Sequence, residues 1–179
     1  MASFRVTVTG ITPVMFDKFS GKEAVKRNQE LPYDEQCQKK VYRMENDDKA
    51  NLAIPGVWLQ ESLKESFIVH AGRGKKQEMD RQASSGIQIR ELMIDLNQTD
   101  YEIDERQIPV KKNGSTVDRN IVYRPLLRNW IATFTLDINM PLSQTDIMAE
   151  LKRAGEEIGM GAGRKIGFGR FQIEKFTKI

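Results

Sequence analysis

Two residue types that build reactive or crosslinked sites are nearly absent from this chain of 179 residues. Cys37 is the single cysteine, which excludes an internal disulfide and any zinc site made of several cysteines. His70 is the single histidine, so at most one imidazole is available for catalysis or metal binding. We therefore expect neither a metal site nor a cofactor.

Long hydrophobic runs are also missing. No apolar stretch approaches the roughly 20 residues that a membrane-spanning helix needs, and no apolar segment typical of a signal peptide follows Met1. Hydrophobic residues make up 39% of the chain and charged residues 30%, a composition that can bury a core. We expect a single cytoplasmic domain that spans residues 1–179 and makes no contact with a membrane.

The net charge is only +3, but the basic residues gather in three glycine-rich or turn-like segments. Such clusters indicate an anionic partner, although a solvated surface explains any one of them equally well. The members of the three clusters are Arg73, Lys75 and Lys76; Lys111, Lys112, Arg119, Arg124 and Arg128; and Arg164, Lys165 and Arg170.

Hydrophobic periodicity predicts four strands. Apolar and polar side chains alternate along residues 3–9 and again along residues 130–138, which is typical of strands buried on one face. A third strand is predicted at residues 87–96, where the alternation changes phase near Arg90 and indicates a bulge. The fourth strand runs from about residue 166 to residue 176.

Two helices are predicted between these strands. Pro55 suits a first helical turn, and the apolar residues after it recur at every fourth position until Gly72. Ser143 and Asp146 form a capping box at the start of the second helix. Residues 73–86 are charged or small, and we predict a loop there.

The predicted order is strand, helix, two strands, helix and strand, with insertions at about residues 13–52 and 97–128. The second insertion predicts a long hairpin with Asn113-Gly114 at its tip. Without the insertions the order is βαββαβ, which is the α+β ferredoxin-like fold that RNA-recognition modules also adopt. This fold packs both helices on one face of an antiparallel sheet and leaves the other face open.

The most distinctive segment, residues 159–171, reads Gly-Met-Gly-Ala-Gly-Arg-Lys-Ile-Gly-Phe-Gly-Arg-Phe. It follows a helix and precedes a strand, whereas a dinucleotide-binding loop needs the opposite order, and it does not match a Walker A loop. Glycines permit close approach of a second backbone, and successive amides can bind an anion. The alternative is a helix stop followed by a bulged strand. The nucleic-acid interpretation assigns backbone contacts to Gly161, Gly163, Arg164, Lys165, Gly167 and Gly169.

This glycine-rich pattern resembles the C-terminal loop of the RAMP superfamily, whose members form CRISPR effector backbones or process CRISPR RNA. Ile54-Pro55-Gly56 resembles the start of the first helix in several members. The resemblance implies binding of single-stranded RNA together with copies of the same chain or other effector subunits. Residues 100–128 would form the thumb-like hairpin of a backbone subunit. At 179 residues the chain would be a compact or phage-encoded member.

Four single residues carry hypotheses about chemistry. Tyr123 lies among the basic residues of the hairpin and is the best candidate for stacking on a base. Cys37 is predicted to be a packed thiol, because no second histidine is available to activate it. His70 could act as the base of an endoribonuclease, although its place at a helix end explains it more simply. Asp17 is a weak candidate for metal-dependent cleavage.

These observations favour a non-catalytic subunit that binds single-stranded RNA within a multi-subunit ribonucleoprotein. Two alternatives stay open. The first is a metal-independent endoribonuclease that processes CRISPR RNA with His70. The second is a phage-encoded mimic of a CRISPR effector subunit.

Overall fold

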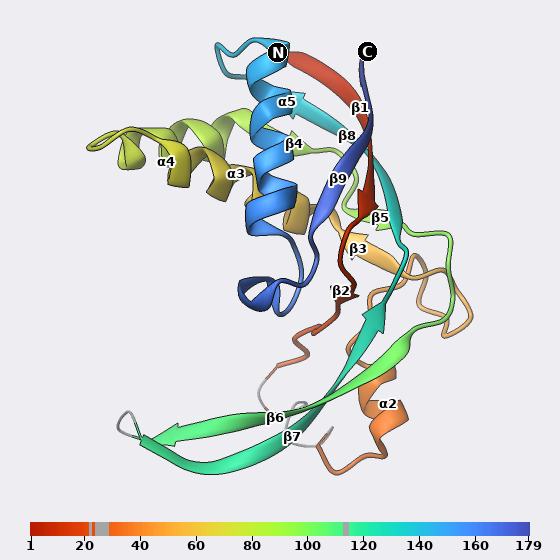
Figure 1. Ribbon diagram of the computed structural model, residues 1–179. Helices are drawn as coiled ribbons and strands as arrows, with labels where there is room; N and C mark the ends of the chain where they lie inside the picture. Colours follow the sequence, from red (N-terminus) through yellow and green to blue (C-terminus); the bar gives the residue numbers. More distant parts are fainter. Residues whose placement is uncertain (22, 24–28, 113–114) are drawn as a thin grey trace.

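The computed structural model describes residues 1–21, 23, 29–112 and 115–179, with the side chains of residues 110–117 left out of the description. Its centre is a four-stranded antiparallel sheet in the order β4-β8-β1-β9 (Figure 1). The strands are β1 (Ala2–Gly10), β4 (Ile87–Ile89), β8 (Ile131–Ile138) and β9 (Phe171–Lys178). Helices α3 (Gly56–His70) and α5 (Gln144–Arg153) pack on one face of this sheet. The α+β ferredoxin-like fold is therefore confirmed.

The hydrophobic core lies between the sheet and the two helices. Alternate residues of β1 point into it, and Phe4 and Val8 are almost completely buried. Helix α3 contributes Leu59 and Leu63, while α5 contributes Leu151. The spacing of four residues places the α3 side chains on one face of the helix, which explains why the periodicity predicted this element correctly.

Both predicted helix starts are confirmed. Pro55 directly precedes α3, where its missing N–H costs no helical hydrogen bond. At the start of α5 the Ser143 hydroxyl accepts a hydrogen bond from the Asp146 backbone N–H. The Asp146 carboxylate in turn accepts one from the Ser143 N–H. These two bonds satisfy amides that otherwise lack a partner at a helix start.

The predicted loop at residues 73–86 is wrong over most of its length. Residues Lys76–Gly86 form a helix, α4, which lies beside α3 (Figure 1). Its apolar stripe consists of Met79, packed against the core, and Ala83, which is 1% exposed. The segment is amphipathic but contains few apolar residues, so its polar composition suggested a loop. Packing against α3 stabilises this helix more than its own propensity does.

The predicted strand at residues 87–96 is two short strands that belong to different sheets. After β4 the chain turns away at Arg90, where the bulge was expected, and β5 (Met93–Asp95) pairs with β3 (Ala53–Pro55).

The last strand begins at Phe171, about five residues later than expected. The residues before it form a short 3-10 helix, η2 (Arg164–Ile166), and the end of α5 continues as η1 (Ala154–Ile158).

The second insertion forms a long two-stranded arm that projects away from the core (Figure 1). Strands β6 (Glu102–Lys112) and β7 (Ser115–Leu127) pair along the arm, as the predicted hairpin requires, and β2 (Val14–Met15) extends this sheet at its base. The predicted tip, Asn113-Gly114, lies outside the described residues. Within the first insertion, α2 (Tyr33–Gln38) packs against β7.

Candidate nucleic-acid interface

The glycine-rich loop, residues 159–170, connects η1 to β9 and lies beside β2 (Figure 1). Its backbone requires glycine at five positions, because each of them has a φ between 68° and 95°. These are Gly159, Gly161, Gly163, Gly167 and Gly169. The unusual density of glycine in the sequence therefore reflects a backbone path that L-residues rarely adopt.

Most of these glycines allow close approach of the protein to itself. The Gly169 N–H donates to the Pro13 carbonyl at 2.8 Å, and the Ala162 N–H donates to the Met15 carbonyl at 3.0 Å. A Cβ atom at Gly169 would lie 1.9 Å from the Met160 carbonyl oxygen. At Gly167, by contrast, a Cβ atom would meet nothing within 4 Å. The loop is thus a packed unit fixed to the segment from Pro13 to Met15 of β2, with one open position.

The loop holds three cations with different surroundings, and the third of them, Arg170, is half-buried at the end of the loop. Arg164 forms an ion pair with Glu65 of α3, with 2.8 Å between Nη1 and Oε2. Lys165 is exposed, and within the described residues the structure records no ion pair for it. Arg164 and Lys165 lie in η2, a single turn that begins and ends at left-handed glycines. Of the predicted basic group, Arg164 is therefore already neutralised by an ion pair, whereas Lys165 is exposed on the surface.

A contact missed by the sequence analysis joins the loop to the arm. The guanidinium of Arg106 in β6 lies over the ring of Phe168, 4.6 Å from its centroid. Asp104 orients this guanidinium with two hydrogen bonds, at 2.5 and 3.1 Å. A cation over an aromatic face is attractive, and a fixed guanidinium loses less entropy in such a contact. The base of the arm is therefore attached to the loop.

The basic residues predicted for the arm also fall into two groups. Arg124 pairs with Asp17 at 2.8 Å, and Arg128 pairs with Glu102 at 3.0 Å. Arg119 is exposed on the outer part of β7. The side chains of Lys111 and Lys112 lie outside the described residues. Asp17 is thus engaged in an ion pair, and among the described residues it belongs to no group of three or more His, Cys, Asp or Glu side chains placed to hold a metal ion.

Tyr123, the predicted stacking residue, is half-buried and contacts another ring. Its centroid lies 5.6 Å from that of Tyr33 in α2. The Tyr123 carbonyl accepts a hydrogen bond from Lys40 Nζ at 2.6 Å, and burial lowers the pKa of this lysine. These contacts attach α2 to the arm, and Tyr33, which is 57% exposed, offers the more accessible ring of the two.

The third basic cluster occupies the turn between α3 and α4. Arg73, Lys75 and Lys76 are all exposed, and the turn projects from the core (Figure 1). The described part of the chain shows no ion pair for these three cations. They are therefore free to meet an anionic partner.

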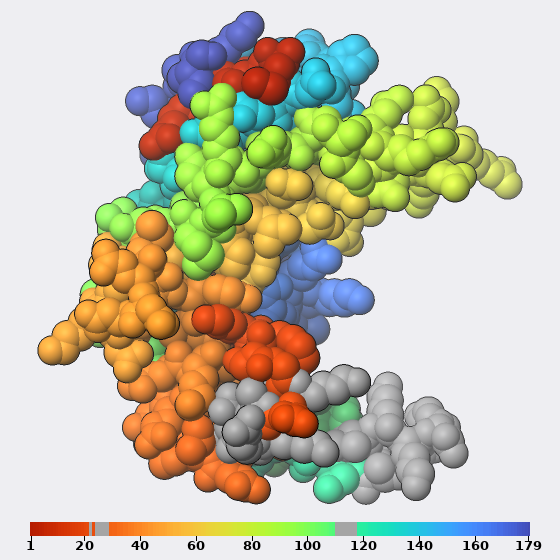
Figure 2. Space-filling model, turned by 180° about the vertical axis from the view of Figure 1, so that it is seen from behind, coloured from red at the N-terminus to blue at the C-terminus, as the bar shows by residue number. Residues whose placement is uncertain are grey.

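These three basic segments border one concave side of the molecule. Seen from behind, the surface is hollowed between the α3–α4 region above and the segment at residues 16–20 below, with the blue atoms of the glycine-rich loop inside the hollow (Figure 2). The α3–α4 turn, the loop and the arm extend to the same side in Figure 1. We call this side the concave face.

The open face of the central sheet is different in character. Its side chains are Ser3, Arg5, Thr7, Thr9, Gln88, Ile131, Thr133, Thr135, Asp137, Gln172, Lys175 and Thr177. None is aromatic, whereas RNA-recognition modules stack bases on aromatic rings of the corresponding face. The open face of the sheet therefore lacks the aromatic side chains on which RNA-recognition modules stack bases.

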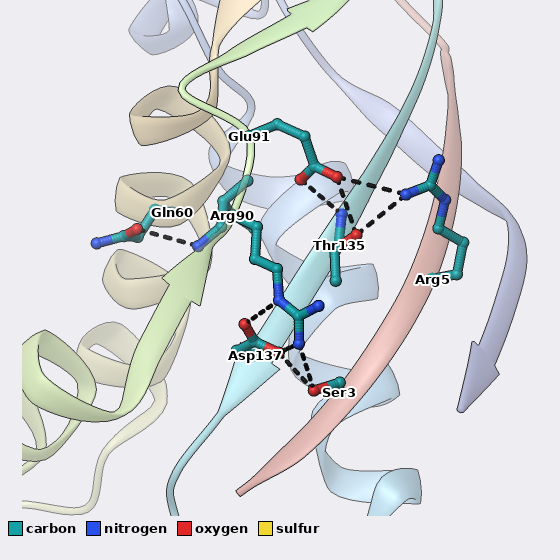
Figure 3. A network of polar contacts seen from close by, with 8 residues as sticks. Ser3, Arg5, Gln60, Arg90, Glu91, Thr135 and Asp137 are labelled. Atoms are coloured by element: carbon teal, nitrogen blue, oxygen red, sulfur yellow. Dashed lines mark hydrogen bonds and ion pairs between the residues drawn. The ribbon is translucent and has the colours of Figure 1, made fainter. Parts of the chain in front are cut away.

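A polar network holds part of this open face in place (Figure 3). Arg90 donates to both carboxylate oxygens of Asp137, at 2.6 and 2.9 Å, and Ser3 donates to Asp137 at 2.5 Å. The Arg90 hydrogen bonds hold the pKa of Asp137 below its ordinary value. Glu91 accepts hydrogen bonds from the backbone N–H and the hydroxyl of Thr135. Its carboxylate thus occupies the place where β4 would continue its pairing with β8.

His70, the candidate catalytic residue, is the last residue of α3 and contacts carboxylates of α5 and η1. Its Nδ1 lies 2.8 Å from the Ser66 carbonyl, and its Nε2 lies 3.1 Å from Glu157. Glu150 lies 3.6 Å from Nδ1. These partners can orient the ring. The alternative function, an endoribonuclease that cleaves RNA with His70, stays a prediction.

Cys37 is completely buried, and burial raises the pKa of its thiol to about 11. It is the packed, protonated thiol that the sequence predicted. The described residues contain no group of three or more His, Cys, Asp or Glu side chains placed to hold a metal ion. No helix in the described ranges combines the length and hydrophobicity needed to cross a bilayer.

Comparison with known proteins gives a structural likeness without a sequence match. No protein-family model and no curated protein matches the chain. A chain in the cryo-EM structure of the type III-B Cmr-beta complex bound to cognate target RNA shares its fold, with a TM-score of 0.56 and 13% sequence identity. The match covers 99% of this chain, which spans 60% of the length of that chain. At this identity the likeness concerns the fold.

Proposed function

We propose that this chain is a CRISPR-associated subunit that binds single-stranded RNA along the concave face. The observation that carries the proposal is the position of the free cations. Lys165 and the three cations of the α3–α4 turn are exposed, and the segments that carry them border the same hollow in Figure 2. Cations in such positions neutralise phosphates and bind a strand without reading its sequence. The RAMP-like glycine pattern and the fold shared with a chain of an RNA-bound complex support the choice of RNA.

Contacts to phosphate should dominate this binding. The concave face presents lysines and arginines from turns, and the sheet face that reads bases in related folds carries no aromatic ring. We therefore expect a steep dependence on salt and a weak preference among sequences. Each phosphate contact on a single strand contributes about −0.7 to the slope of log affinity against log salt.

The loop cations provide the direct test. Replacing Arg164 and Lys165 together by alanine should weaken the binding of an oligouridine by about 1–3 kcal/mol, if each side chain makes a charge-assisted hydrogen bond. Thermal stability should change little, because exposed ion pairs contribute about 0–1 kcal/mol. Fluorescence anisotropy and thermal melts measure the two effects.

The chain offers a matched control for this test. Lys152 and Arg153 are adjacent exposed cations of α5, and each also pairs with a carboxylate. Their double alanine variant removes the same charge from a different element. Equal losses of affinity in both double variants would show that only the net charge matters, and unchanged affinity in the loop variant would contradict the proposal.

We further propose that several copies assemble along one RNA. The support is the long arm, which projects from the core and exposes Glu105 on β6 and Arg119 on β7. Exposed charges of both signs allow complementary contacts with a neighbouring subunit. Native mass measurements with RNAs of increasing length should show stepwise addition of chains. A single chain on every RNA, whatever its length, would contradict assembly.

A further inference from the structure

Arg164 already has an anionic partner in the absence of RNA. Glu65 lies on α3 and Arg164 lies in η2, so the ion pair connects the helix to the glycine-rich loop. Arg164 also lines a small pocket together with Trp58 and Glu61 of α3. The side chain that should meet a phosphate therefore first has to leave a carboxylate.

The exposure of this ion pair permits such an exchange. The side chains of Arg164 and Glu65 are 33% and 44% exposed, so a phosphate can reach the guanidinium. The Arg90–Asp137 pair differs in this respect. There the guanidinium is 50% exposed, but the carboxylate is only 9% exposed, accepts two hydrogen bonds from Arg90 and accepts a third from Ser3, so an external anion replaces it less readily. The Arg164–Glu65 pair, in which the carboxylate is also exposed, is the better suited of the two to exchange.

We propose that Glu65 competes with an RNA phosphate for Arg164 and thereby limits the affinity of the concave face; this inference rests on the proposed function. A carboxylate and a phosphate accept hydrogen bonds from the same N–H groups of a guanidinium. When the phosphate binds, the Arg164–Glu65 ion pair breaks and the Glu65 carboxylate remains beside the strand without its partner. Both consequences oppose binding.

The same arrangement recurs on the arm. Arg124 pairs with Asp17 and Arg128 pairs with Glu102, in both cases through partly exposed side chains. Lys165 has no carboxylate of this kind within the described residues. RNA should therefore meet the unpaired cations first, and each paired arginine should join only when a phosphate displaces its carboxylate. Such exchange discriminates against weakly charged ligands, which cannot compete with a carboxylate.

Replacing Glu65 by glutamine tests the competition. Glu65→Gln should bind an oligouridine about two- to fivefold more tightly than the wild type, which is the range expected for one exposed ion pair. The gain should be largest at low salt and should shrink toward 1 M salt, where the screening length falls to about 3 Å. Glu174→Gln on β9 is the control for net charge and should change affinity less.

The decisive measurement repeats Glu65→Gln in an Arg164→Ala background. If Glu65 competes for Arg164, its gain largely disappears there, and the double-mutant cycle shows coupling. An equal gain in both backgrounds would mean general repulsion and would overturn the inference, as would no gain in the wild-type background. If the wild type and every variant fail to bind RNA, the proposed function falls first and this inference falls with it. Thermal melts confirm that all variants are folded.

Discussion

The glycine-rich loop and the α3–α4 turn have similar sequences but different structures. Both place glycines beside arginine and lysine, as Gly163-Arg164-Lys165 and as Gly72-Arg73-Gly74. In the loop, a Cβ atom at Gly169 would lie 1.9 Å from a backbone oxygen. In the turn, a Cβ atom at Gly74 would meet nothing within 4 Å. The first segment is packed against the protein and the second is open to solvent.

The cations of the two segments differ in the same way. Arg164 is held by a carboxylate of α3, whereas Arg73 and its neighbours project into solvent. A glycine next to a basic residue therefore occurs in two kinds of structure. It can allow a chain to fold closely on itself, or it can lie in a solvent-exposed turn that carries charge. The sequence pattern does not distinguish them, because the contacting atoms come from distant positions such as Pro13 and Glu65.

The largest expected effect is the loss of stability when a glycine of the packed loop, and not one of the open turn, is replaced by alanine. Gly169→Ala should destabilise the protein by about 3–5 kcal/mol, because it adds a backbone clash to a φ of 68°. Gly74→Ala, at a φ of 82° in open space, should cost only about 1–2 kcal/mol. Denaturant unfolding of the two variants measures the difference.

Gly167 provides the control within the loop itself. Its φ is 95°, but no atom lies within 4 Å of the added Cβ. Gly167→Ala should therefore behave like Gly74→Ala, at about 1–2 kcal/mol, and differ from its neighbour Gly169. If all three variants lose the same stability, the contrast between packed and open glycines is wrong, and backbone strain explains the whole effect.

The parts of the fold that the sequence predicted are those with a strong local pattern. The alternation in β1 and β8, the spacing of four residues in α3 and the capping box of α5 all depend on nearby residues. Helix α4 was missed because its apolar face consists of few residues, chiefly Met79 and Ala83, within a segment of mostly polar composition. The division of residues 87–96 between two sheets depends on tertiary pairing, which periodicity does not contain.

For the candidate interface, the residue types were predictable but their partners were not. The basic clusters and the special backbone of the loop are visible as local composition. The carboxylates that hold Arg124, Arg128 and Arg164 lie on other elements, and so does Arg106, which covers Phe168. Only the fold brings these groups together. Composition therefore overestimates the number of cations that are free to bind an anion.

The smallest expected effect tests the open turn. Replacing Arg73, Lys75 and Lys76 by alanine should leave the melting temperature nearly unchanged, because exposed cations contribute little to stability. Each cation that contacts a phosphate contributes about 0.7 to the salt slope, so the slope of RNA binding should become shallower by about 0.7–2.1. Affinity titrations at several salt concentrations measure this change. The loop variant that lacks Arg164 and Lys165 should lose less slope, since a guanidinium that exchanges one anion for another gains less from phosphate than a free cation does. A turn variant with an unchanged slope would remove the α3–α4 turn from the interface and restrict binding to the loop and the arm.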